Sequence, residues 1–297
     1  MVWESSEQDD DLEGVFAQRF WNTGAKNGPE VQVNEQSLNE QMRPRVAMQP
    51  SGSFAVVWEG YQQESAQGNG ETGYDVLLRC FNGNGTPVTG DTVMNKHLAG
   101  DQMRPIVSAF PDGSGRYLAG WQSYNELGEG SGWVLFARLF NAQCSPMGSP
   151  FQVTEQGSDE PFVVDAAVDL EGRFVFVWED GDILAQRYDL DAEKDGGAFV
   201  VNQVTDGTQG HPAVSYLPSQ HFLVVWESEG EDEEGLAVKA GEFTGNGGSV
   251  SLEWTVNATT VHDQHNPAVA GRPNGTWVVA WQSEQQDGEL GSIVAKL

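Results

Sequence analysis

The sequence predicts an all-β fold, and three observations carry that prediction. One motif, an aromatic residue followed four positions later by Trp-Glu or Trp-Gln, recurs along the whole chain. Short runs rich in β-branched and aromatic residues alternate with Gly, Pro, Asn and Asp, as strands alternate with turns. No ten-residue stretch shows the 3.6-residue period of an amphipathic helix. Four strands in a unit that repeats every 48 to 63 residues indicate a β-propeller of four-stranded blades.

The motif marks the second strand of each unit. Its aromatic residue and its Trp lie on one strand face, because side chains alternate with a period of two, so both are expected to pack between blades. The acid or amide after each Trp recurs too regularly for a catalytic site, which needs groups in different environments, and we expect it to be structural. The copies are FAVVWE (54–59), YLAGWQ (117–122), FVFVWE (174–179), FLVVWE (222–227) and WVVAWQ (277–282), with the half-copy VWE at 2–4.

The other strands follow from their place in the unit. The first strand is expected to begin at a Pro, which a Gln precedes by three residues in four of five units. The third strand ends in most units at Phe or Tyr, and after a Gly-rich turn the fourth ends in Asn or Thr. First strands begin at Pro44, Pro105, Pro161, Pro212 and Pro267; third strands span 15–20, 76–81, 134–140, 183–188, 238–243 and 293–297; fourth strands span 31–34, 92–95, 151–154, 199–202 and 254–257.

The strand count bears on blade number and ring closure. Six second and six third strands occur, but only five first and five fourth strands. We expect six blades in a single propeller domain spanning 1–297, with five or seven blades as alternatives and with ring closure incomplete or completed by the N-terminal strand. An incomplete blade leaves unpaired backbone groups at a sheet edge, so self-association through that edge is expected; a longer parent protein would explain the count equally well.

Charge excludes some classes of partner. The chain has 44 acidic and 15 basic side chains, a formal charge of −29, which repels phosphate backbones and anionic lipid heads. Nucleic acid and membrane insertion are therefore not expected.

No apolar run reaches the roughly 18 residues of a membrane span, and the start MVWESSEQDDD lacks the features of a signal peptide. The two cysteines, Cys80 and Cys144, leave the redox state open.

The loops between second and third strands are expected to form an acidic face, since they hold 19 of the 44 acids. Closely spaced carboxylates with Gly for tight turning suit Ca²⁺, although neither dense loop matches the EF-hand pattern. A solvated acidic surface that keeps the protein soluble is the alternative. The candidate metal ligands are Asp9, Asp10, Asp11, Glu13, Glu231, Asp232 and Asp287.

Six further residues depart from the repeat and are candidates for ligand binding. Trp21, Trp133 and Trp254 are suited to stack on a sugar ring or to anchor a partner, with ordinary packing as the alternative. The run VHDQHNP places His262 and His265 in one loop, on the same face as His211 of the preceding unit. Histidines with an intervening Asp can ligate a transition metal, but the sequence identifies no distant third ligand.

The repeat resembles the propeller-forming repeats of long secreted or surface proteins of bacteria. Those repeats alternate Gln-x-x-Pro, Val-Val-Trp-Glu/Gln, Ala-Gln-Arg-Phe and a Gly turn running to Val-Asn, and the most similar copies here are Gln264 to Ser283 and Gly14 to Asn34. The resemblance covers nearly the whole chain. It implies the propeller fold and an extracellular or cell-surface location, while the start of the chain leaves a cytoplasmic location open, and it implies no particular activity.

Two classes of function compete. The sequence favours a non-catalytic binding or assembly module that uses the acidic face for cations or for a basic protein partner. The alternative is a carbohydrate-active enzyme, a glycosidase or polysaccharide lyase, or a lectin, with a glycan as its partner. Propellers support both classes. The sequence contains no nucleophile elbow, P-loop, zinc-protease helix or dinucleotide fingerprint, so an enzyme is the less favoured class.

Overall fold

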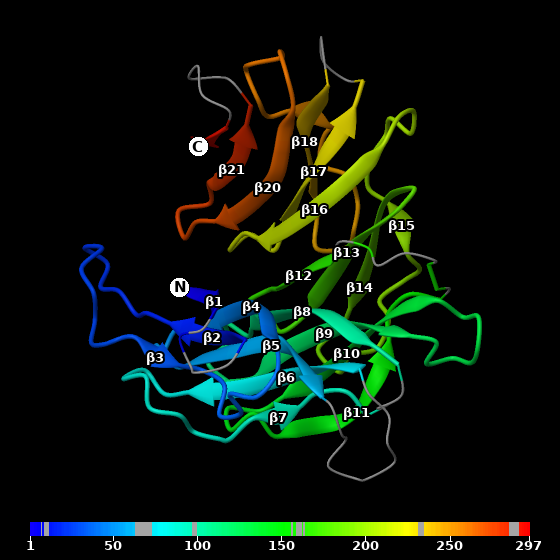
Figure 1. Ribbon diagram of the computed structural model, residues 1–297. Helices are drawn as coiled ribbons and strands as arrows, with labels where there is room; N and C mark the ends of the chain where they lie inside the picture. Colours follow the sequence, from blue (N-terminus) through cyan, green and yellow to red (C-terminus); the bar gives the residue numbers. More distant parts are fainter. Residues whose placement is uncertain are drawn as a thin grey trace. The chain divides into compact units, whose positions relative to one another are not determined.

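The computed structural model describes residues 1–6, 8, 12–62, 73–96, 100–155, 157–158, 162, 164–230, 235–284 and 291–297. These residues form strands, turns and irregular segments, and none of them belongs to a helix that could span a membrane. The chain falls into two compact units, Met1–Pro161 and Phe162–Leu297. Each unit holds three antiparallel sheets, which we number as blades 1 to 6 in chain order (Figure 1).

The first unit contains blades 1 to 3, in which strands adjacent in the chain pair with one another. Blade 1 consists of β1 (Val2–Ser6), β2 (Glu13–Ala17) and β3 (Val31–Gln32). Blade 2 consists of β4 (Gln41–Met48), β5 (Phe54–Gln62), β6 (Gly73–Phe81) and β7 (Thr92–Val93). Blade 3 consists of β8 (Gln102–Ala109), β9 (Tyr117–Tyr124), β10 (Trp133–Phe140) and β11 (Pro146–Gln152).

The second unit contains blades 4 to 6 with the same connectivity. Blade 4 consists of β12 (Val164–Val168), β13 (Phe174–Asp180), β14 (Asp182–Tyr188) and β15 (Phe199–Val200). Blade 5 consists of β16 (Gln209–Tyr216), β17 (Phe222–Glu229), β18 (Leu236–Phe243) and β19 (Trp254–Thr255). Blade 6 consists of β20 (Gln264–Gly271), β21 (Trp277–Ser283) and β22 (Ser292–Lys296).

The strand count agrees with the sequence prediction, but the start of the first strands does not. Among the described residues, blades 1 and 6 have three strands and the other blades four. In blades 2, 3, 5 and 6 the first strand begins at the Gln, and the Pro lies inside the strand. The pairing register shifts around each of these prolines. A bulge accommodates Pro there because the extra residues of a bulge are left out of the hydrogen-bond ladder.

The hydrophobic core lies between consecutive blades of each unit. Phe54 and Trp58 of blade 2 share a buried cluster with Val15 and Val33 of blade 1. The aromatic residues of the motif do the same in other blades, as predicted: Tyr117 and Trp121 pack against blade 2, Phe222 and Trp226 against blade 4, and Trp281 with Trp277 against blade 5. Each blade therefore depends on its neighbour to bury its apolar face.

The carboxylate after the repeat Trp binds the backbone of the next blade. Four of these carboxylates accept a hydrogen bond from the N–H of the residue that precedes the bulged Pro. That preceding residue has a φ near +50° in every case. The pairs are Glu4 with Arg43, Glu59 with Arg104, Glu179 with His211 and Glu227 with Asn266. The structural role expected for these acids is confirmed at these four positions.

Cys80 and Cys144 form a disulfide between blades 2 and 3, with their Cα atoms 5.7 Å apart. Cys80 lies in β6 and Cys144 in the turn after β10, and both are buried. The sequence left their redox state open, because no local pattern brings together two residues that are 64 positions apart.

Candidate functional site

Comparison of equivalent positions in the blades shows how blade 6 differs from blades 2, 3 and 5. Each first strand with an initial Gln pairs that Gln with the residue directly after the acid or amide of the motif. The residue before the Gln then accepts a backbone hydrogen bond from the residue across the hairpin. Three positions therefore cluster at this end of each blade: the one before the Gln, the one after it, and the one across the hairpin.

Only blade 6 fills all three positions with potential metal ligands, among the four blades in which the structure describes them. The three positions hold Glu40, Met42 and Tyr61 in blade 2, Asp101, Met103 and Tyr124 in blade 3, Thr208, Gly210 and Glu229 in blade 5, and Asp263, His265 and Glu284 in blade 6. Departure from a repeat is informative because the repeated residues already satisfy the needs of the fold. We call Asp263, His265 and Glu284 the blade 6 cluster.

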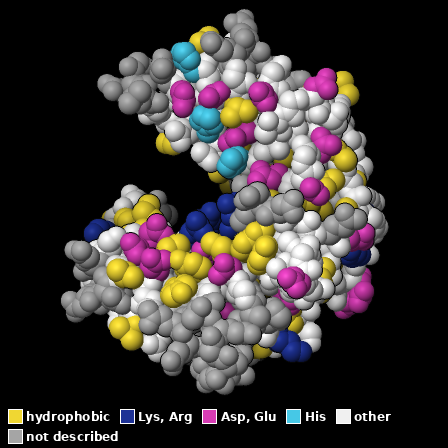
Figure 2. Space-filling view, turned by 45° about the vertical axis from the view of Figure 1, so that its right-hand side comes forward, with side chains coloured by type: hydrophobic (Ala, Val, Ile, Leu, Met, Phe, Trp, Pro, Cys, Tyr) yellow, Lys and Arg dark blue, Asp and Glu magenta, His cyan; other side chains and the backbone are white. Residues whose placement is uncertain are grey.

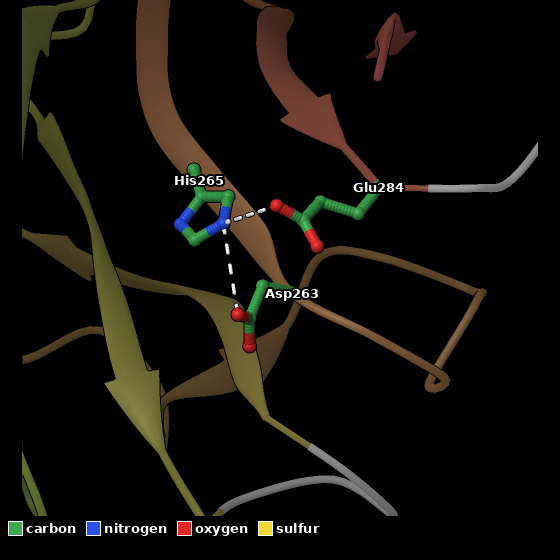
Figure 3. Close-up of side chains that lie close together, drawn as sticks. All are labelled: Asp263, His265 and Glu284. Atoms are coloured by element: carbon green, nitrogen blue, oxygen red, sulfur yellow. Dashed lines mark ion pairs between the residues drawn. The ribbon is translucent and has the colours of Figure 1, made fainter. Parts of the chain in front are cut away.

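The three side chains of the cluster converge (Figure 3). His265 Nε2 lies 3.4 Å from Glu284 Oε1 and 3.8 Å from Asp263 Oδ2. One ligand atom from each residue lies within 4.8 Å of the other two. The His265 side chain is 23% exposed and both carboxylates are 40% exposed, so the cluster is accessible to a ligand from solution.

Backbone contacts hold Asp263 in place. Its Oδ1 accepts a hydrogen bond of 2.9 Å from the N–H of Leu236, the first residue of β18 in blade 5. A Cβ added at Gly235, whose φ is +88°, would collide with this same oxygen, so a glycine is needed for the approach. Oδ1 is thus occupied by the backbone, and Oδ2 faces the imidazole of His265.

A second imidazole lies in the neighbouring blade. His211 Nδ1 is 3.0 Å from Glu227 Oε2, and the other oxygen of Glu227 accepts the N–H of Asn266, next to His265 in the chain. All four histidines in the described part of the chain belong to the second unit. Figure 2 shows histidine and acidic side chains gathered on one face of that unit.

The other residues expected to bind a ligand lie elsewhere. His262 does not contribute an atom to the cluster. Trp133 is 8% exposed and packs on Tyr124 with ring centroids 5.1 Å apart, which favours the packing alternative, and ligand binding by Trp133 stays a prediction. Trp21 is 58% exposed and Trp254 is 38% exposed, and ligand binding by either stays a prediction.

The calcium prediction falls almost wholly outside the described residues. Asp9, Asp10, Asp11, Glu231, Asp232 and Asp287 all lie outside them. Glu13 is described: it begins β2, and its Oε1 accepts a hydrogen bond of 3.3 Å from Ser6 Oγ. A calcium site on these loops therefore stays a prediction.

Sequence reasoning identified His265 but missed Glu284. The missing signal was the hairpin register: Gln264 pairs with Ser283, so the residue before Gln264 must lie opposite Glu284. The N–H of Glu284 donates to the carbonyl of Asp263 over 3.0 Å. An imidazole between two carboxylates can hold a divalent cation, bind polar groups of a ligand, or exchange protons with it.

Glu59, a buried acid of the first unit, has structural partners. Glu59 is fully buried, and this burial raises the pKa of its carboxyl above the ordinary value. Hydrogen bonds from the N–H of Arg104 and from the Arg43 guanidinium, 3.0 Å away, oppose the rise in that pKa. This carboxylate therefore belongs to the contact between blades 2 and 3.

Comparison with known proteins identifies the fold. No family model and no curated protein sequence matches the chain. The GH93 α-L-arabinofuranosidase of Fusarium graminearum, solved with arabinobiose, shares 13% identity over 89% of this chain and 83% of its own, with a TM-score of 0.57. A protein of unknown function from Dyadobacter fermentans shares 10% identity over 89% and 80% of the chains, with a TM-score of 0.58. The chain is a β-propeller. Identities this low show the fold alone, and the all-β propeller prediction is confirmed.

Proposed function

We propose that this β-propeller binds carbohydrate, with the blade 6 cluster as its recognition site. The observation that carries the proposal is the convergence of Asp263, His265 and Glu284 at three positions that blades 2, 3 and 5 do not fill with three potential ligands. Carboxylates accept hydrogen bonds from sugar hydroxyls, and an imidazole can accept from or donate to them. The partial exposure of these side chains leaves room for a ligand. The solved arabinofuranosidase with a similar fold was crystallised with arabinobiose, which supports a glycan as the ligand class.

The test is calorimetric titration with a panel of neutral oligosaccharides that includes arabinobiose. We expect at least one of them to bind, and His265→Met to weaken that binding at least tenfold. Methionine stands at the equivalent position of blades 2 and 3, so this variant should fold. Glu229→Gln is the matched control, because Glu229 occupies the position of Glu284 in blade 5, where Gly210 stands at the position of His265. Failure of the whole panel to bind, or equal binding by both variants, would contradict the proposal.

Glycoside hydrolysis at the same cluster is a second candidate, favoured by the spacing of its two carboxylates. Oxygens of Asp263 and Glu284 lie within 4.8 Å of each other, and retaining glycosidases place their two carboxyl groups about 5 Å apart. Hydrolysis predicts that oligosaccharides which bind are also cleaved, and that Asp263→Asn retains binding while losing cleavage. Binding without release of new reducing ends would leave recognition as the function.

We also propose that the chain works in an oxidising, extracellular setting. The buried Cys80–Cys144 disulfide supports this location, because such bonds persist outside the reducing cytosol. The resemblance to secreted bacterial repeat proteins points the same way. Purification of the native protein with the disulfide fully reduced would contradict it.

A further inference from the structure

We propose that the blade 6 cluster binds one divalent transition-metal ion, with Zn²⁺ as its representative. The ligands are His265 Nε2, Asp263 Oδ2 and Glu284 Oε1, which Figure 3 shows pointing toward one another. This inference deepens the proposed function and its consequence for glycan binding rests on that function, although metal binding itself can be tested without a glycan.

The distances suit a shared ion. Two N or O ligands of a tetrahedral Zn²⁺, each about 2.0–2.2 Å from the metal, lie roughly 3.3–3.6 Å apart. The imidazole nitrogen lies 3.4 Å from one carboxylate oxygen and 3.8 Å from the other. The two carboxylate oxygens lie within 4.8 Å of each other, so a movement of up to about 1 Å in these partly exposed side chains would complete the site.

Part of the cluster is already oriented for this role. The N–H of Leu236 binds Oδ1 of Asp263 and leaves Oδ2 directed at the imidazole. Outer contacts of this kind fix the direction of a metal-binding carboxylate. The same backbone bond recurs in blade 3, where Asp101 Oδ1 accepts the N–H of Tyr74 over 3.1 Å. That bond is therefore part of the fold, and what blade 6 adds is the histidine and the second acid.

The donor set favours a transition metal over Ca²⁺. Calcium takes six to eight oxygen ligands, whereas one imidazole and two carboxylates match the nitrogen and oxygen ligands of zinc. Three protein ligands leave a fourth position open, which is the arrangement of zinc sites that bind a further molecule. If the proposed function holds, a hydroxyl of the glycan would occupy that position. Both carboxylates would then serve as ligands, which favours recognition over hydrolysis.

The experiment is calorimetric titration of the untagged, chelator-treated chain with ZnCl₂ and, separately, with CaCl₂, in buffered NaCl that screens the acidic surface. We expect one Zn²⁺ site per chain that His265→Met weakens at least tenfold, and Ca²⁺ binding that this variant leaves unchanged. Glu284→Gln should weaken Zn²⁺ binding as well. The controls are Asp101→Asn and Glu229→Gln, which alter the equivalent positions of blades 3 and 5 and should leave Zn²⁺ affinity within twofold.

Two results would overturn the metal inference. One is Zn²⁺ binding that His265→Met does not change while circular dichroism shows the variant to be folded, since the ion would then lie on other acids. The other is no saturable Zn²⁺ site, in which case His265 simply contacts the two acids without a metal. Glycan titrations with and without Zn²⁺ separate this inference from the proposed function. Glycan binding of equal affinity with and without Zn²⁺ would contradict only the role of the metal in glycan binding. A Zn²⁺ site in a protein that binds no glycan would contradict only the proposed function.

Discussion

Asp75 illustrates how a single buried acid affects stability. It lies in β6, is buried, and its Oδ1 accepts a hydrogen bond of 2.7 Å from Asn95 Nδ2. Burial raises the pKa of its carboxyl above the ordinary value, and the bond from Asn95 only partly opposes this. A raised pKa means that the folded state holds its proton to higher pH than the unfolded chain does. Stability from this group therefore falls as pH rises from about 3.9 through the folded pKa.

Replacement of Asp75 by Asn should remove this penalty and keep an acceptor for Asn95. We expect Asp75→Asn to raise the free energy of unfolding at pH 7 by no more than about 1 kcal/mol, because residual contact with water weakens such effects. The gain should vanish near pH 3, where the carboxyl is protonated in both states. Denaturant titrations at the two pH values measure it. Asp182→Asn is the control, since Asp182 makes the same bond to Asn202 over 2.7 Å at a half-buried position; a gain independent of pH would contradict the explanation.

A recurring bond explains the Asn or Thr that the sequence placed at the end of each fourth strand and that the structure places two residues beyond that end. Its side-chain oxygen accepts the N–H of a third-strand residue 19 positions earlier, in five of the blades. Most fourth strands are only two residues long, so this bond extends the pairing beyond the backbone ladder. The pairs are Asn34 with Val15, Asn95 with Val76, Thr154 with Leu135, Asn202 with Ile183 and Asn257 with Val238.

This bond can be tested in blade 5. Asn257→Ala would leave the buried N–H of Val238 without its partner, and such a loss costs about 1–3 kcal/mol. Asn257→Thr should cost less, because Thr154 makes the equivalent bond in blade 3 over 3.0 Å. Chemical denaturation of the three proteins measures the difference. Equal destabilisation by Ala and Thr would show that the Asn acts through its other bonds, such as the one to the carbonyl of Thr259.

The elements could be predicted because each one occurs five or six times. A single Trp-Glu after an aromatic residue is ambiguous, whereas five copies and a half-copy in one order predict both the order and the number of the strands. The sequence analysis started the first strands at the Pro, but they begin three residues earlier, at the Gln. This was missed because Pro usually ends a hydrogen-bond ladder, and only the bulge shows that Pro is tolerated inside these strands. Glu284 was missed because its place beside His265 depends on hairpin register, which the sequence pattern does not state.

At the scale of the molecule, the disulfide is the covalent link that the repeat did not predict. It joins consecutive blades of the first unit and closes a loop between residues 64 positions apart. Restricting the unfolded chain over such a loop stabilises the folded state by about 4 kcal/mol in the chain-entropy model. Both cysteines lie in the first unit. Removal of the disulfide therefore tests whether the two units unfold together.

A single propeller predicts one cooperative unfolding transition, because each blade is stabilised by its neighbours. Replacement of both cysteines by Ala should then lower the whole transition, by roughly 5–10 °C for a loss of about 4 kcal/mol. Differential scanning calorimetry of the oxidised chain and of this variant measures the shift. Addition of a reducing agent to the oxidised chain should give the same shift, which separates loss of the bond from the smaller packing defect of the Ala side chains. Two transitions, of which the variant moves only one, would show that Met1–Pro161 and Phe162–Leu297 unfold as separate domains.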